Sequence, residues 1–446
     1  MLLVVCAAVG LGTLALAQFN TVGQVWAFGN LENDALVYGP VAGLVLALLA
    51  WHLSPRRSWV DLLVFGALCA MPAQVFLLTP KSFAGWMETP YLAVSSLAAP
   101  VLLVGLLGAA SAVWQAGSRA AGAALIGATL LVPPLAGLVI ALVVFGVGAF
   151  VPVIGLVLAA ATVVLAVVAG RQQAEAPSRP GWRVTLGGAV AGLTPLVFHF
   201  WRGPDTGPGN GMDPETYYLL AGRHLLAAGL VVLGAGLLAG LLAGTRVLVT
   251  GTAAGLLLGG LGELTWPAMF DIRGLPVGIP TAVVIVALAV GVALALPRAR
   301  VLVGAAGLGV LVLGLAVLWL VFSADDPIFG AGVTHVLTPV LMFVGVVAAV
   351  ALLASLGSVL APVGAVPAAL AGVVAAVAAG VDGIVTYFTF TNFGARSTTS
   401  GTFPPVIVAL LCAIGLAVLA HQLWRHPRPV VQPQPAAGRL DTAGVG

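Results

Sequence analysis

The sequence predicts an all-α protein: a polytopic integral membrane bundle of about fourteen membrane-spanning helices with no sizeable soluble domain. Two observations lead to this fold class. Of the 446 residues, 61% are hydrophobic and only 7% are charged, whereas a soluble domain has about 25% charged residues. Each span needs roughly 20 apolar residues and each connection about ten more, so the chain length fits about fourteen spans.

The first six helices are apolar runs separated by short polar or basic segments. Arg56 and Arg57 separate the second run from the third, and Lys81 lies between the third and the fourth. Around Pro133 and Pro134 a kink or a half-helix is an alternative to one regular span. The expected ranges are 2–18, 36–53, 59–79, 91–114, 120–144 and 151–170.

The remaining eight helices follow residues 171–182, the longest inner loop. The eighth and ninth are joined only by Gly244 to Arg246, so they must be antiparallel neighbours. The polar gap between Ala354 and Pro362 is a second place where a kink or half-helix is possible. The expected ranges are 183–201, 217–243, 246–266, 278–296, 301–322, 335–354, 361–388 and 405–424.

We therefore expect a single transmembrane bundle over residues 1–424. The inner loop 171–182 suggests possible sub-bundles at 1–170 and 183–424, joined by a cytoplasmic linker. The Pro-rich tail 425–446 is expected to be disordered and cytoplasmic.

The distribution of arginine predicts the orientation, because short cytoplasmic loops carry an excess of Lys and Arg. Alternate loops and the tail hold Arg56, Arg57, Arg119, Arg171, Arg179, Arg183, Arg246, Arg298, Arg300, Arg425, Arg428 and Arg439. The opposite loops hold only Lys81, Arg202, Arg273 and Arg396. We expect a multi-pass protein of the cell (inner or plasma) membrane with both termini cytoplasmic.

The first helix has one alternative interpretation. Ala15, Leu16 and Ala17 before Gln18 are typical of a signal-peptide cleavage site. However, no basic residue precedes Leu2, so we expect the helix to be retained. Cleavage would leave about thirteen spans and would not change the rest of the topology.

Ionised side chains inside spans are the best candidates for function, since each costs roughly 2.5–3.5 kcal/mol at the centre of a helix. Glu263 is expected near the outer end of the ninth helix and Asp382 near that of the thirteenth. Arg223 and His224 lie at a similar depth in the eighth. Arg223 could pair with either acid. These four residues are candidates for binding a proton or a substrate; a static ion pair is the alternative.

Four further residues could line a vestibule on the outer side. His199 and His335 are expected at the outer ends of their helices, and Glu32 and Asp34 in the first outer loop. Each histidine could equally be an ordinary interfacial side chain.

Several functions are excluded or disfavoured by what the sequence contains. Its arginine clusters are too short for a nucleic-acid surface. Cys6, Cys69 and Cys412 have no metal-ligand spacing, so we expect no metal and no cofactor. We find no Walker-type glycine loop, nucleophile elbow or zinc-protease motif, and hence no catalytic residue to name.

The function expected is a permease-like transporter of a small or amphipathic solute, with proton coupling as one option. Its partners would be the lipid bilayer and that solute. An outer-face enzyme that uses lipid-linked sugar or envelope lipid is one alternative, because Glu32 and Asp34 are acidic residues in an outer loop. A non-catalytic membrane subunit or scaffold is the other. No family is recognised from these motifs.

Overall fold

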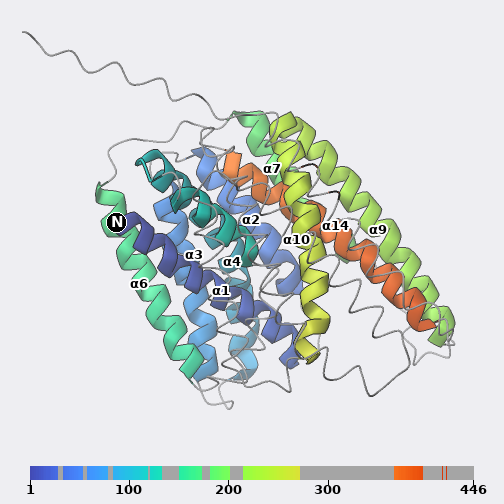
Figure 1. The fold of residues 1–446 in the computed structure, drawn as a ribbon. Helices are drawn as coiled ribbons and strands as arrows, with labels where there is room; N and C mark the ends of the chain where they lie inside the picture. The colour runs from blue at the N-terminus through green and yellow to red at the C-terminus, as the bar shows by residue number, and fades with distance from the viewer. Residues whose placement is uncertain are drawn as a thin grey trace, which may run out of the picture.

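The computed structural model describes most of the first 271 residues and one later helix. The described residues are 1–28, 34–53, 58–78, 84–118, 121–132, 150–172, 181–200, 214–271 and 366–394, with Ile414 and Val418. All regular structure in these ranges is helical, which confirms the all-α fold class (Figure 1). The predicted spans at 278–296, 301–322 and 335–354 lie outside them, as do most of 405–424 and the tail.

The described helices follow the order of the predicted spans. They are α1 (Leu2–Phe28), α2 (Asp34–Leu53), α3 (Ser58–Leu78), α4 (Ala84–Gln115), α6 (Val151–Gln172), α7 (Trp182–Leu193), α8 (Leu196–Phe200), α9 (Pro214–Ala243), α10 (Thr245–Asp271) and α14 (Val366–Gly394). Residues 121–132 are also helical. Within the described part, four segments are long and apolar enough to cross a membrane: Ser58–Leu78, Ala93–Gln115, Val151–Arg171 and Gly222–Ala243.

Several helices extend beyond their predicted apolar range. α1 continues from the predicted end at residue 18 to Phe28, and α4 begins at Ala84 instead of residue 91. Hydropathy identifies the part of a helix that lies in hydrocarbon, whereas backbone hydrogen bonding continues through polar residues that do not break the helix. The predicted boundaries were therefore too narrow at these ends.

The seventh span, predicted as one helix over 183–201, is divided into α7 and α8. Pro195 has no backbone N–H to donate to the carbonyl four residues earlier, so the helical ladder is interrupted there. The Thr194 hydroxyl donates to the Ala191 carbonyl at 2.8 Å, and the Thr194 N–H donates to the same oxygen at 3.1 Å. Because these bonds satisfy a carbonyl at the break, the chain can bend within the membrane.

α14 lies at the centre of the second part of the chain. It packs against α9, α10 and α7, and also reaches α4 and α2 (Figure 1). Its direction follows from the contacts. Residues 229, 236 and 240 of α9 meet 380, 376 and 373 of α14, so these two helices are antiparallel. Residues 251, 255 and 259 of α10 meet 373, 377 and 381, so α10 and α14 are parallel.

These directions bear on the predicted topology. A parallel pair joined in sequence by a chain that crosses back and forth requires an odd number of crossings between them. The three spans predicted between residues 272 and 365, which lie outside the described residues, would satisfy this requirement.

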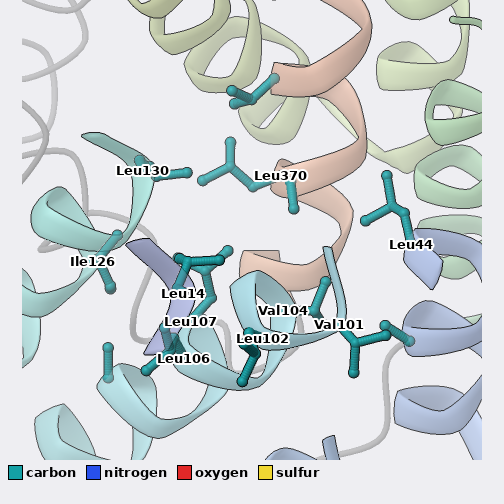
Figure 2. Close-up of a cluster of buried hydrophobic side chains, with 14 of the residues drawn as sticks. Leu14, Leu44, Val101, Leu102, Val104, Leu106, Leu107, Ile126, Leu130 and Leu370 are labelled. Atoms are coloured by element: carbon teal, nitrogen blue, oxygen red, sulfur yellow. The ribbon is translucent and has the colours of Figure 1, made fainter. Parts of the chain in front are cut away.

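A continuous apolar core connects the helices on both sides of residues 171–182. Leu14 of α1, Leu44 of α2, Leu107 of α4 and Leu370 of α14 all belong to one buried cluster. Figure 2 shows these side chains together with Ile126 and Leu130 of the 121–132 helix. The core is therefore shared between the two possible sub-bundles.

One buried hydrogen bond joins α1 to α6. The hydroxyls of Thr13 and Thr162 lie 2.8 Å apart, and each is also within reach of a carbonyl of its own helix, Val9 for Thr13 and Leu158 for Thr162. One hydroxyl can donate across the interface while the other donates to its own backbone.

Removal of this bond should have a small and non-additive effect. We expect Thr13→Val or Thr162→Val to lower the free energy of unfolding by about 0.6 kcal/mol, and the double variant by little more. The measurement is a double-mutant cycle in mixed detergent. Thr129→Val is the control, because the Thr129 hydroxyl bonds only the Leu125 carbonyl of its own helix. Additive effects of the two substitutions would contradict a direct bond.

Candidate functional site

Small residues let α14 approach its neighbours closely on three sides. A Cβ built on Gly229 of α9 would lie 2.9 Å from the carbonyl oxygen of Gly380, and one built on Gly255 of α10 would lie 2.6 Å from the Cβ of Val377. At the inner end, Gly372 meets the carbonyl of Gly188 in α7. α7, α9 and α10 therefore cover three sides of α14. The remaining side is the one available to α2 and α4, which α14 also contacts.

Asp382 lies on this remaining side of α14. Its neighbours in sequence face other helices: Val381 meets Gly259 of α10, and Gly383 meets Phe198 of α8 and Gly229 of α9. Asp382 itself is exposed. At helical spacing, residues 371, 375, 379 and 382 fall on one side of the helix, so Asp382 is directed toward the region between the two groups of helices.

Exposure increases along this side of α14 from Ala371 to Asp382. Ala371 is buried in the core at 1% exposure, Ala375 and Ala379 are half-buried, and Asp382 is exposed. This side of α14 is thus closely covered at Ala371 and less covered at Asp382. An ionised carboxylate inside a span is tolerated where it faces water or a partner, not lipid, so this side is expected to border a water-filled space.

The three charged candidates differ in depth. Counted from the turn at Gly244 at 1.5 Å per residue, Arg223 of α9 lies about 30 Å above that turn and Glu263 of α10 about 27 Å. Val381 of α14 packs beside Gly259 of α10, so Asp382 is level with residue 260 of α10. Asp382 therefore lies about 22 Å above the turn at Gly244. The hydrocarbon core is about 30 Å thick, so Asp382 is the deepest of the three.

Arg223 lies away from the α14 interface, about 120° around α9 from Gly229 at helical spacing. It shares a helical stripe with Leu230 and Leu241, which are 53% and 55% exposed, whereas Gly229, Gly236 and Gly240 face α14. Arg223 is exposed. The described side chains include no ion pair between Arg223 and Asp382.

Glu263 and His224 lie on α10 and α9, the two long helices that pack against α14. Glu263 is the next position in the series Gly251, Gly255 and Gly259 along which α10 meets α14; its side chain lies outside the described part. His224 is half-buried on α9. Glu263 therefore lies on a helix that packs against α14, about one helical turn beyond the level of Asp382.

The vestibule residues are only partly described. His199 belongs to α8, whose Phe198 packs on Gly383 beside Asp382. Asp34 is the first residue of α2. That end of α2 meets α8 through the rings of Tyr38 and Phe200, whose centroids are 6.2 Å apart. Glu32 and His335 lie outside the described residues.

One polar contact between the two groups of helices was not anticipated. His52 Nδ1 of α2 lies 3.1 Å from the Thr185 hydroxyl of α7. On the same two helices, Leu48 approaches Gly188 and Leu44 approaches Gly192. In the sequence, this contact is visible only as a histidine in the last turn of one span and a threonine in the first turn of another. Such residues are common at membrane interfaces.

The described residues contain no group of three or more His, Cys, Asp or Glu that could hold a metal ion. Cys6 and Cys69 are free and buried; Cys412 is outside the described part. Asp382 is the carboxylate that the described part places on this side of α14.

Comparisons with known proteins give similarity only at the level of structure. No protein-family model matches the sequence, and no curated protein sequence is significantly similar to it. The crystal structure of the human organic anion transporter MFSD10 (TETRAN) matches with a TM-score of 0.47 and 17% identity, over 94% of this chain and 99% of that chain. The xylose transporter XylE from E. coli, in a partially occluded inward-open conformation, matches with a TM-score of 0.44 and 14% identity, over 96% and 99% of the two chains.

Proposed function

We propose that the chain is a permease-like transporter of a small or amphipathic solute, coupled to protons through Asp382. The observation that carries the proposal is an exposed carboxylate within the apolar helix α14, on the side of that helix that α7, α9 and α10 do not cover. A scaffold has no need of such a group, because replacing it by an apolar residue would lower the cost of insertion. A carrier needs a group that can exchange a proton or solute with one side of the membrane.

Glu263 is proposed as a second acid of the same site, one turn farther out on α10. Arg223 and His224 are proposed to lie at its outer edge, with His199, His335, Glu32 and Asp34 as residues of the vestibule. Arg223 would contribute through the electrostatic field of the outer surface and not through direct pairing with Asp382, since it shares the exposed stripe of Leu230 and Leu241.

The accessibility of α14 tests this site. In a background with Cys6, Cys69 and Cys412 replaced by alanine, Asp382→Cys and Ala379→Cys should react with a membrane-impermeant thiol reagent added from outside. Val381→Cys should not, because Val381 is fully buried against α10. Equal protection of all three positions would show that no water-filled space reaches Asp382.

Reconstituted vesicles then separate the transporter from the enzyme. The purified parent should take up members of a broad solute panel when a pH gradient is imposed across the vesicle membrane. If it moves none of them but consumes a lipid-linked sugar, the outer-face enzyme replaces the transporter.

The proposed orientation has both termini in the cytoplasm of a cell membrane. In the same Cys-free background, single cysteines at Ser178 and at Thr206 should label from opposite sides, that at Thr206 from outside. These positions lie in the predicted loops before and after the seventh span. Labelling of both from one side would contradict the orientation.

A further inference from the structure

We propose that the solute recognised at Asp382 carries a positive charge. This inference rests on the proposed function for its setting and adds the chemical class of the substrate. It follows from the charges around the site and not from the similarity to other transporters.

The first step is that no described side chain forms a cationic partner for Asp382. Asp382 forms no ion pair with any described residue, and the nearest candidate in the sequence, Arg223, lies away from the α14 interface of α9. The side of α14 that leads to Asp382 otherwise carries Ala371, Ala375 and Ala379, which supply no charge. The described side chains on this side of α14 are therefore apolar except for Asp382. Besides Arg223, the titratable groups near its level on the helices beside it are His224 of α9, Glu263 of α10 and His199 of α8, and the side chains of Glu263 and His199 lie outside the described part.

The second step concerns the charge that this side of α14 favours. In a region of low dielectric constant, a carboxylate attracts a cation and repels an anion more strongly than in water. An anionic solute would have to approach Asp382 without a described positive group to compensate it. A cation with an apolar body can place its charge against Asp382 and its body along the alanine side of α14, and on binding it supplies the partner that buried charge requires.

The third step is competition with the proton. A protonated Asp382 has no charge to attract the cation, so the two occupants exclude each other at one carboxylate. Exchange of the two occupants at Asp382 then links cation release to proton uptake.

The experiment uses two probes of nearly equal shape and opposite charge, tetraphenylphosphonium and tetraphenylborate. Binding to the purified full chain in detergent is measured by equilibrium dialysis. We expect saturable binding of tetraphenylphosphonium that weakens as the pH is lowered, and at least tenfold weaker binding by Asp382→Asn. Asp61→Asn is the matched control, since Asp61 is an exposed acid in the first turn of α3, and it should bind as the parent does.

The outcomes distinguish this inference from the proposed function. Preference for tetraphenylborate, or equal binding of the cation by Asp382→Asn and the parent, overturns the cationic substrate even if the protein transports a neutral or anionic solute. Binding of the cation that depends on Asp382 supports the inference even if no solute crosses the membrane, and in that case the transporter itself is what fails.

Discussion

The variant Gly372→Leu should not yield a stably folded protein. A Cβ at this position would overlap the backbone carbonyl of Gly188 in α7, and a backbone atom cannot move aside as a flexible side chain can. To accommodate leucine, α7 and α14 would have to separate where both also contact the buried core through Ala369 and Ala191. We expect a loss of about 3 kcal/mol or more, at the upper end of overpacking effects.

The measurement is the unfolding midpoint in detergent, together with the monomer peak in size-exclusion chromatography. Gly234→Leu is the control, because nothing lies within 4 Å of a Cβ built at that position of α9. Both substitutions add the same leucine side chain to a helix. The difference between their unfolding midpoints therefore measures the effect of the contact between α7 and α14. If Gly372→Leu unfolds at the midpoint of the parent, the close approach of α7 and α14 is not a feature of the protein.

Asp382→Asn should abolish proton-linked solute uptake while leaving the fold intact. The amide has nearly the shape of the carboxyl group but cannot take up and release a proton. Because Asp382 forms no ion pair with a described residue, the substitution leaves no described charge without its partner. We expect at least a tenfold loss in uptake driven by a pH gradient in reconstituted vesicles, with an unchanged unfolding midpoint.

Two other variants locate the effect. Glu263→Gln should reduce coupled uptake less than Asp382→Asn, since Glu263 lies about one turn closer to the end of its helix than the level of Asp382. Asp61→Asn should transport as the parent does. An Asp382→Asn variant that still moves solute and protons together would make Asp382 structural and would remove the main residue of the proposed mechanism.

Composition and hydropathy were sufficient for the fold class, since a chain with so few charged residues can only be dissolved in lipid. They were also sufficient to place most of the described helices, because a span has a nearly fixed length. The division at Thr194 and Pro195 was missed, although a proline in the interior of a span was visible in the sequence. Hydropathy averages over such a residue, while the hydrogen bond it removes is local.

The candidate site shows what the sequence could not provide. Depth along a helix can be counted from a loop, so Arg223, Glu263 and Asp382 were expected at similar levels. Which side of a helix faces a distant segment depends on packing that brings residues 229 and 380 together, and no local pattern records that contact. The structure shows that α14 packs against a different side of α9 from the one that carries Arg223, Leu230 and Leu241. The sequence alone could not assign these three residues to an exposed side.

The depth of Asp382 also determines how strongly the proposed proton site would respond to membrane voltage. A unit charge that crosses the whole membrane gains about 2.3 kcal/mol per 100 mV. In the proposed orientation, with the Gly244 turn at the inner edge of a hydrocarbon layer about 30 Å thick, Asp382 lies about 8 Å below the outer edge. A proton that reaches it from outside therefore crosses at most about a quarter of the electrical potential, or about 0.6 kcal/mol per 100 mV. Occupancy of this carboxylate would follow the acidity of the outer medium far more than the electrical state of the cell.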